Sequence, residues 1–180
     1  MHPRIAELEH HLDSTREELR AAIASVPAER RSTVPIQGGW SANAVLEHLV
    51  IVESNIGRLL SKKIADARAA GVGAETDDSP ILASLDTKKV LDRSVKIEAP
   101  EAIQPKQVRE YETAWAELEA ARARFKQLLN DADGFAFREI SHPHPLFGPL
   151  DGYTWIAFLG SHEARHAAQI REIGASVERM

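Results

Sequence analysis

The chain has 180 residues, of which 43% are hydrophobic and 27% charged, and it contains no cysteine, which excludes disulfides, thiolate ligands and a cysteine nucleophile. The formal net charge is −5 at pH 7, and lysines and arginines are scattered among acids, so we expect no nucleic-acid partner. No segment approaches the roughly 18 consecutive apolar residues of a membrane helix, and the first residues are charged throughout, so we expect no membrane partner and a cytoplasmic location.

Two amphipathic helices are predicted in the first part of the chain. Residues 3–26 place apolar side chains at helical spacing, with one proline in the first turn and another after the end. Residues 41–69 form a second apolar stripe, for which Ser41 is a suitable N-cap. His48 occupies a position of this second stripe where a hydrophobic residue is expected.

A long polar connection and a third helix follow. Residues 71–104 are rich in glycine, proline and acids, with one short helix expected near residues 81–85. A connection of this length is unusual unless it crosses over or covers a site. A third helix is predicted over residues 105–130, with an inner face that begins at Val108. Residues 135–140 could be extended, but one short strand does not make a sheet.

A fourth helix is predicted to begin near Asp151 or Thr154 and to end near Ile173, where Gly174 suits the C-terminal cap. Four long amphipathic helices without a convincing strand predict an all-α fold. We expect a four-helix bundle with a long crossover connection, formed as one domain over residues 1–180.

Three of the eight histidines lie on the apolar stripes of two helices. His162 and His166 are four residues apart, which puts their Cβ atoms roughly 5–6 Å apart on one helix face, so they could hold one ion together. His48, from another stripe, could complete a set of three imidazoles and leave a position open for water or substrate. A buried polar cluster without metal is the alternative.

The other five histidines carry weaker expectations. His2, His10 and His11 lie on a polar N-terminal helix and are expected at the solvent-exposed surface. His142 and His144 lie in a loop rich in proline, where a structural role is favoured, although such a loop could line a pocket.

His162, Glu163 and His166 also form H-E-x-x-H, the helical signature of a zinc protease. Such proteases take a third ligand from a downstream Glu or His. The segment after His166, AAQIREIGASVERM, has no histidine, so we expect no peptidase and infer that the third ligand lies upstream, at His48. A di-iron site is also not expected, because it needs several inward-facing glutamates.

Two blocks of sequence resemble the DinB/YfiT superfamily of small metal-binding four-helix bundles. The first, GGWSANAVLEHL, places Trp40 and Ser41 before the helix that carries His48. The second, HEARHAAQI, matches the family's pattern H-x-x-x-H-x-x-Q-[IL] at His162, His166, Gln169 and Ile170. The resemblance implies one divalent metal ion, nickel or zinc first and iron or manganese as alternatives, held by the three histidines of two helices.

The same resemblance implies a function. Several relatives are thiol-dependent transferases and many are dimers, so we expect a homodimeric thiol S-transferase that joins a low-molecular-weight thiol to an electrophile. Two alternatives stay open: a metal-dependent hydrolase on the same three histidines, and a non-catalytic, metal-binding dimeric bundle of a stress response.

Four further side chains have expected roles near this site. Glu163 flanks the metal ligands, either as a base or as a supporting carboxylate, and Gln169 could orient a ligand by a hydrogen bond. Arg122 lies on or near the inner stripe of the third helix, where it could reach the edge or pair with a buried acid. Arg165 is expected to face outward.

Overall fold

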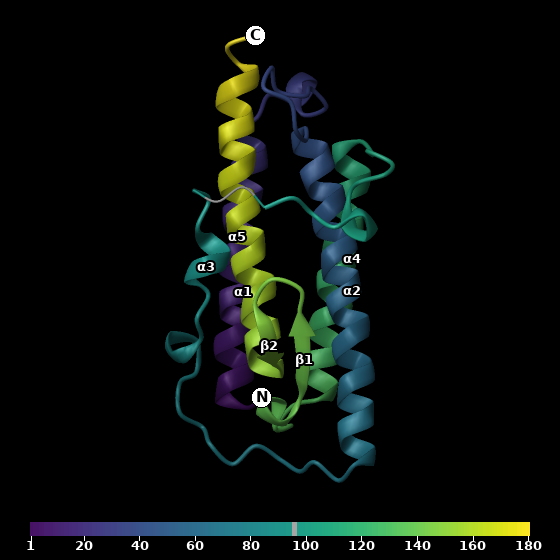
Figure 1. The fold of residues 1–180 in the computed structure, drawn as a ribbon, viewed down its shortest axis with the longest axis vertical. Coiled ribbons are helices and arrows are strands. Elements are labelled where there is room, and N and C mark those ends of the chain that lie inside the picture. The colour runs from purple at the N-terminus through teal and green to yellow at the C-terminus, as the bar shows by residue number, and fades with distance from the viewer. Residues whose placement is uncertain (95–96) are drawn as a thin grey trace.

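The structure is a computed structural model that describes residues 1–94 and 97–180. Four long helices run side by side along its longest axis (Figure 1), which confirms the predicted four-helix bundle. They are α1 (Pro3–Ala24), α2 (Ala42–Ala69), α4 (Tyr111–Asp131) and α5 (Gly152–Val177). The shorter elements are α3 (Lys88–Leu91), the strands β1 (Ser141–His144) and β2 (Gly148–Asp151), and the 3-10 turns η1 (Ala28–Arg30), η2 (Leu82–Ser84), η3 (Glu101–Ile103) and η4 (Phe137–Glu139). No helix within the described residues has both the length and the apolar character needed to cross a membrane.

The directions of the long helices explain the long connection between α2 and α4. α1 and α5 run one way along the bundle, and α2 and α4 run the other way (Figure 1). α1 packs mainly on α5, and α2 packs mainly on α4. Because α2 and α4 are parallel neighbours, the chain between them has to return along the bundle, and it does so past α3, which packs on α5. The predicted crossover is therefore confirmed, and the short helix expected near residues 81–85 is the 3-10 turn η2.

The two helices that carry the histidines begin where the sequence predicts. Ser41 Oγ accepts a hydrogen bond of 3.2 Å from the backbone N–H of Ala44, at the start of α2. Asp151 Oδ1 accepts one of 2.7 Å from the backbone N–H of Thr154, at the start of α5. Each side chain satisfies a donor that the first turn of a helix leaves unpaired.

Two helix boundaries differ from the prediction. α4 begins at Tyr111 rather than at residue 105, because Val108 is 52% exposed and does not belong to the buried face that the prediction assumed. α5 continues through Gly174 to Val177 instead of ending there. A Cβ atom on Gly174 would lie 3.2 Å from Val26 Cγ2, so this glycine lets α5 approach the chain that follows α1.

The expectation that no strands form was wrong. β1 and β2 pair as an antiparallel hairpin in which His144 lies opposite Gly148, and residues 135–140 contain η4 instead of a strand. Gly148 has φ +74°, which L side chains rarely adopt, and this conformation closes the turn. Pro143 and Pro149 also face each other. Proline is tolerated there because both strands of a two-stranded ribbon are edges.

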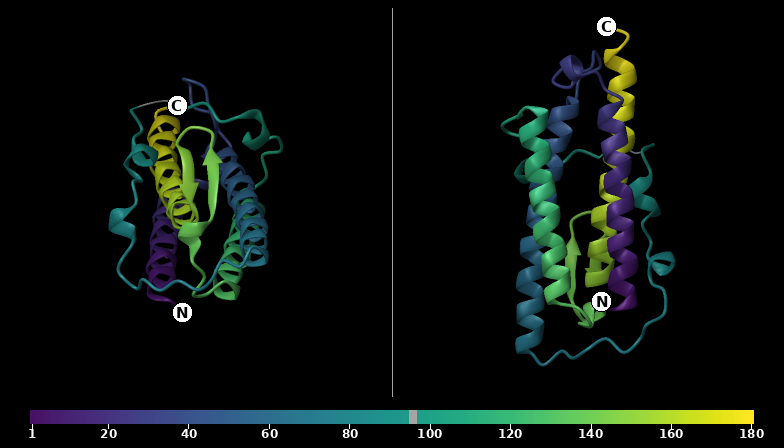
Figure 2. Two further views of the ribbon diagram at one scale, coloured as in Figure 1. Left: turned by 60° about the horizontal axis from the view of Figure 1, so that its bottom comes forward. Right: turned by 180° about the vertical axis from the view of Figure 1, so that it is seen from behind.

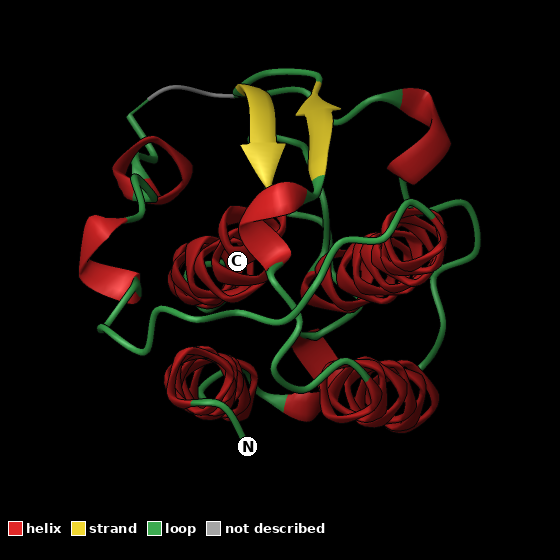
Figure 3. Ribbon diagram, turned by 90° about the horizontal axis from the view of Figure 1, so that it is seen from below, coloured by secondary structure: helices red, strands yellow, loops and turns green. Residues whose placement is uncertain are grey.

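The hairpin lies against one side of the bundle. In a view along the helices, the four long helices occupy the corners of a square and the hairpin lies outside one edge (Figure 3). A second view places it beside α5, facing the gap toward α2 (Figure 2). The hairpin and the connection between α2 and α4 thus surround the α2–α5 face of the bundle.

The interior of the bundle has two apolar clusters with a layer of charge between them. One cluster includes the start of α5, and the other includes its last turns. Between them lie four charged side chains, one from each long helix and each at most 5% exposed: Arg16, Glu53, Arg122 and Glu163. We call these four residues the charged layer.

Candidate metal centre

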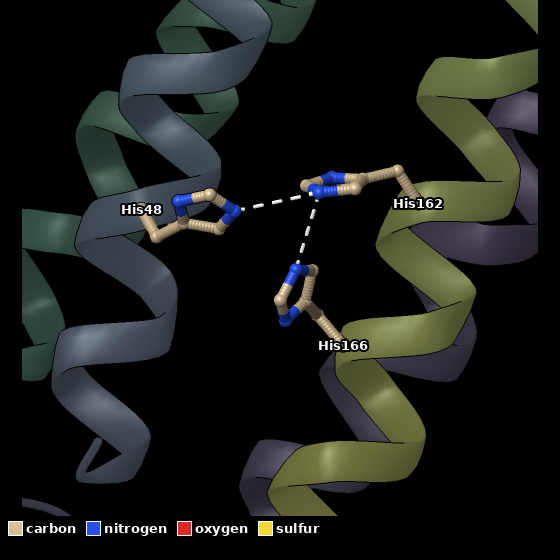
Figure 4. A group of neighbouring side chains, drawn as sticks. All are labelled: His48, His162 and His166. Atoms are coloured by element: carbon tan, nitrogen blue, oxygen red, sulfur yellow. Dashed lines mark hydrogen bonds between the residues drawn. The ribbon is translucent and has the colours of Figure 1, made fainter. Parts of the chain in front are cut away.

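Three imidazole rings converge between α2 and α5. His48 comes from α2, and His162 and His166 come from successive turns of α5 (Figure 4). His162 Nε2 lies 3.4 Å from His48 Nε2 and 3.2 Å from His166 Nε2. The structure therefore brings together the three histidines that the sequence analysis selected.

The spacing of these nitrogens suits a single cation. A zinc–imidazole bond measures about 2.0–2.1 Å, so two imidazole nitrogens on one ion lie about 3 to 3.5 Å apart. The ligand atoms of the three histidines all lie within 4.8 Å of one another. The donors are imidazole nitrogens alone, which suit zinc, nickel, copper and iron. This group could hold one divalent ion.

Hydrogen bonds on the far sides of two rings prepare their Nε2 atoms for a cation. His48 Nδ1 donates to the carbonyl oxygen of Ile103 at 2.8 Å, and His166 Nδ1 donates to Gln169 Oε1 at 2.7 Å. A neutral imidazole that donates from Nδ1 carries a lone pair on Nε2. Gln169 thus contacts the ring of His166, and Ile103 is an orienting contact from η3 that the sequence did not suggest.

Burial keeps the three rings neutral. It lowers the pKa of His48, and it lowers that of His166 to about 3, with a further contribution from His48. The pKa of His162 falls well below its ordinary value because of burial and then because of the two neighbouring histidines. Near neutral pH the three rings are therefore neutral. His48 and His166 carry lone pairs on Nε2, toward which a proton on His162 Nε2 could donate in the metal-free protein, and a cation between the three atoms would take the place of that proton. Within the described parts of the chain, His162 Nδ1 is buried without a partner.

The three histidines line a cavity of about 830 Å³. Small-molecule sites have volumes of roughly 300–1,000 Å³. α2, α5, the hairpin and residues 97–104 of the long connection contribute its walls. The indole of Trp40 lies against two ligands, with its ring centroid 4.9 Å from that of His48 and 6.5 Å from that of His166. The connection thus covers a site, as its length suggested.

Glu163 is not brought to the three histidines. Its carboxylate accepts hydrogen bonds from Arg16 Nε at 2.6 Å, Arg122 Nη2 at 3.0 Å and Thr15 Oγ1 at 3.2 Å. It is 2% exposed and does not line the cavity. On a helix of 3.6 residues per turn, neighbouring side chains point about 100° apart. Glu163 directly follows His162, so its carboxylate points into the bundle while His162 points to the cavity.

Of the two alternatives for Arg122, reaching the edge of the bundle or pairing with a buried acid, the structure shows the second, with two acids. Arg122 Nε donates to Glu53 Oε1 at 2.6 Å, and Nη2 donates to Glu163. Burial alone would lower the pKa of Arg122, but the two carboxylates raise it above its usual value. Sequence reasoning missed Arg16 and Glu53. For Arg16 the sequence contained a signal, because this charged residue lies between Leu12 and Leu19 on an apolar stripe.

Arg165 does not face outward as expected. It lines the cavity, and Nη1 donates to the carbonyl oxygen of Val90 at 3.1 Å and to that of Asp92. Both carbonyls belong to the connection around α3, so Arg165 fastens this connection to α5 beside the site. This contact could not be predicted from residue spacing, because the partners are carbonyl groups of a loop far away in the chain.

The remaining histidines divide into three groups. His10 is exposed, as expected, and His2 caps α1 by accepting from the backbone N–H of Arg4. His11 is only partly exposed: its Nε2 lies 3.3 Å from the Ala157 carbonyl oxygen, and burial lowers its pKa. The ring fits because α5 has a glycine at this point: a Cβ atom on Gly160 would lie 2.6 Å from His11 Nε2. His144 lines the cavity, whereas His142 packs beside Trp155 next to it. 

Comparisons with known proteins agree with this architecture. The sequence model of the DinB superfamily matches residues 11–170. The uncharacterized protein YuaE of Bacillus subtilis (strain 168) is 29% identical over 159 residues, which cover 84% of this chain and 87% of YuaE. The crystal structure of TT2238, a four-helix bundle protein, matches with a TM-score of 0.61 and 20% identity, over 93% of this chain and 98% of that one. The last similarity concerns the fold.

Proposed function

This chain belongs to the DinB superfamily, and we propose that it is a divalent-metal-dependent thiol S-transferase. In this reaction a low-molecular-weight thiol meets a small electrophile. A sulfur–carbon bond forms and the thiol proton passes to solvent. An alkyl halide loses its halide with the bonding electrons, whereas an epoxide or a Michael acceptor keeps the displaced electron pair, on oxygen or on carbon, and takes up a proton there. The observation that carries the proposal is the convergence of three neutral imidazole Nε2 atoms on the wall of a cavity of about 830 Å³.

His48, His162 and His166 hold the ion in this proposal. Zinc and nickel suit three imidazoles better than manganese does, because manganese prefers oxygen ligands. When bound, the divalent ion supplies a Lewis-acid centre that lowers the pKa of a coordinating thiol. The carbonyl of Ile103 and the amide of Gln169 keep two of the rings in the required orientation.

The environments of the nearby carboxylates favour thiol transfer over hydrolysis. Glu163 is held by two arginines, Glu172 is paired with Arg93, and Glu98 is exposed. A zinc-bound water has a pKa of about 7, whereas a thiol that coordinates such an ion is deprotonated outright. Thiol ionisation therefore asks less of a neighbouring base than water ionisation does. The chain has no cysteine, so the thiol is a cosubstrate.

The walls of the cavity serve the same reaction by limiting water. Residues 97–104 and the hairpin cover the α2–α5 face, and apolar side chains of α5 lie beside the ligands. A site with little water favours attack on the electrophile by sulfur over hydrolysis by solvent.

Metal content and thiol consumption test the proposal together. We expect purified protein to carry about one divalent ion per chain by elemental analysis, and His48→Ala to lose it, whereas His10→Ala, on the exposed face of α1, retains it. The loaded protein should consume thiol with a panel of alkyl halides, epoxides and Michael acceptors, and a chelator should stop this.

Each other outcome selects a different function. Ester or amide hydrolysis without thiol consumption would identify a hydrolase on the same ligands. A chelator that lowers the melting temperature of a protein with neither activity would identify a non-catalytic, metal-stabilised bundle. Equal metal content in His48→Ala and the parent protein would overturn the ligand assignment.

The homodimer, the cytoplasmic location and the single domain over residues 1–180 stay predictions. Size-exclusion chromatography with light scattering tests the first of them. A monomer at micromolar concentration would contradict the homodimer and leave the metal site unaffected, because all three ligands come from one chain.

A further inference from the structure

Four rings form a continuous aromatic surface at one end of the cavity. They belong to His144, Phe147, Trp155 and Phe158, and we call them the aromatic wall. The ring centroid of His144 lies 4.7 Å from that of Phe147 and 4.7 Å from that of Phe158. Trp155 and Phe158 are 5.7 Å apart and nearly perpendicular. These distances between ring centroids are within the range of about 4.5–7 Å that is typical of interacting aromatic pairs.

The aromatic wall adjoins the three histidines. Phe158 precedes His162 by one helical turn on α5, and their ring centroids are 5.3 Å apart. Trp155 lies a further turn toward the start of the helix. A molecule in the cavity that reaches the His162 Nε2 atom therefore has Phe158 beside it.

The hairpin holds its part of the wall in place. His144 Nδ1 accepts a hydrogen bond of 3.1 Å from the backbone N–H of Leu146. Trp155 Nε1 donates to the His142 carbonyl oxygen at 3.2 Å. Because these two polar atoms have partners inside the protein, the wall offers ring faces and edges apart from Nε2 of His144. Burial lowers the pKa of His144, so its ring is neutral as well.

The opposite end of the cavity differs in character. Gln169 and Glu172 follow His166 on α5, and Arg93 donates to Glu172 at 2.8 Å. Both signs of charge are present there, whereas the aromatic wall contains no carboxylate and no cation. The aromatic wall therefore lies on the hairpin side of the three histidines, whereas Arg93 and Glu172 lie on the other side, together with the apolar side chain of Ile173.

We propose that this cavity binds a small molecule with an aromatic ring, which packs on the aromatic wall and places the adjoining part of the molecule beside His162. This molecule is the electrophile of the transfer reaction, an assignment that rests on the proposed function. Binding of the ring itself depends only on the wall. Ring-to-ring contacts add to the burial of apolar area, so a planar aromatic ligand should bind better than a saturated one of similar size.

The test compares two neutral probes, 2-naphthol and its saturated counterpart decahydro-2-naphthol, by titration calorimetry on metal-free and on metal-loaded protein. We expect 2-naphthol to bind about three- to ten-fold more tightly. Phe147→Leu and Phe158→Leu, which keep apolar volume and remove a ring, should each reduce this preference about threefold or more. Tyr111→Leu is the control, because Tyr111 packs on Trp115 away from the cavity.

The outcomes separate this inference from the proposed function. Equal affinity for the two probes, or a preference that survives both substitutions, overturns the inference even in a protein that carries metal and transfers thiols. A preference that both substitutions remove, in a protein that binds no metal, supports the inference and overturns the proposed function. Phe147 lies in the hairpin turn, so Phe147→Leu decides the matter if Phe158→Leu does not fold.

Discussion

Arg122 Nη2 donates a hydrogen bond of 3.0 Å to Glu163 Oε2 in the centre of the bundle, although Glu163 directly follows the candidate ligand His162 in the chain. Arg16 and Glu53 complete the charged layer through further ion pairs. The layer joins all four long helices at the height of the three histidines. By drawing Glu163 inward, it sets the rotation of α5 that turns His162 and His166 toward the cavity.

The charged layer should be sensitive to the loss of one cation. Arg122→Met leaves Glu53 and Glu163 with Arg16 as their shared partner, and we expect the free energy of unfolding to fall by about 3–5 kcal/mol. Urea denaturation measures this. Lys126→Met is the control on the same helix, because its ion pair with Asp13 lies near the surface and should contribute at most about 1 kcal/mol. Equal losses in the two variants would show that the layer does not stabilise the fold.

Glu163→Gln separates the structural role of this carboxylate from a role as base. If Glu163 acted as the general base, the variant would lose about 10²- to 10⁴-fold in rate while it kept its metal. Since two arginines hold the carboxylate inside the bundle, we expect a lower melting temperature and a rate of thiol consumption within tenfold (about one order) of the parent. The rate is measured at saturating metal, below the melting temperature of the variant. A rate that falls by about 10² or more at full metal content would show that Glu163 acts as the base.

The amide of Gln169 should support metal binding without touching the ion. Gln169→Leu removes the acceptor of His166 Nδ1, and loss of such a contact typically weakens metal affinity about 10- to 100-fold. Competition with a chromophoric chelator measures the dissociation constant. Gln127→Leu, which removes an exposed amide of α4 that donates to Asp131, is the matched control. An unchanged affinity in Gln169→Leu would mean that the packing of Trp40 and the helix alone orient His166.

The metal-free protein should lose stability in acid through its buried histidines. An unfolded histidine has a pKa of about 6.5, whereas burial holds the pKa of His166 at about 3 and lowers those of His48 and His162. Between these values the unfolded chain binds more protons than the folded one, so stability falls as the pH falls from about 6.5 toward 3. Above about pH 7 these three groups contribute no pH dependence.

His166→Leu isolates this contribution from that of the carboxylates, which also titrate in acid. Melting temperatures of the metal-free parent and variant are measured in steps from pH 7.5 to about pH 4. The parent should lose more degrees over this range than the variant, because the variant lacks one of the depressed groups. Parallel curves would contradict the neutral state that burial imposes on His166.

The helices and the candidate ligands could be recognised in the chain because their signals are local. A stripe of apolar residues requires a period of 3.6 residues and nothing beyond the helix itself, and the histidine in the stripe of α2 is visible as an exception to that pattern. The N-caps at Ser41 and Asp151 are likewise decided by a hydrogen bond that spans three residues. His162 and His166 share a face for the same reason.

The hairpin was harder to recognise, because its strands have four residues each and proline at a paired position. Short strands rich in proline resemble loops until a partner strand is known. Gly148, which has a positive φ in the turn, indicates a bend in the sequence, but it does not show which residues pair before and after that bend.

Gln169, which orients His166, is only three residues away, but the directions of His48, Glu163 and Arg165 depend on partners more than 40 positions away in the chain. His48 and His162 are 114 positions apart in the chain, and Arg16 and Glu163 are 147 positions apart. Spacing along one helix places Glu163 next to His162, but the energy of leaving a charge buried and unpaired decides that it turns toward Arg16 and Arg122. Helical periodicity thus located the candidate metal ligands, while the packing of four helices determined that their nitrogens converge and that the neighbouring carboxylate does not join them.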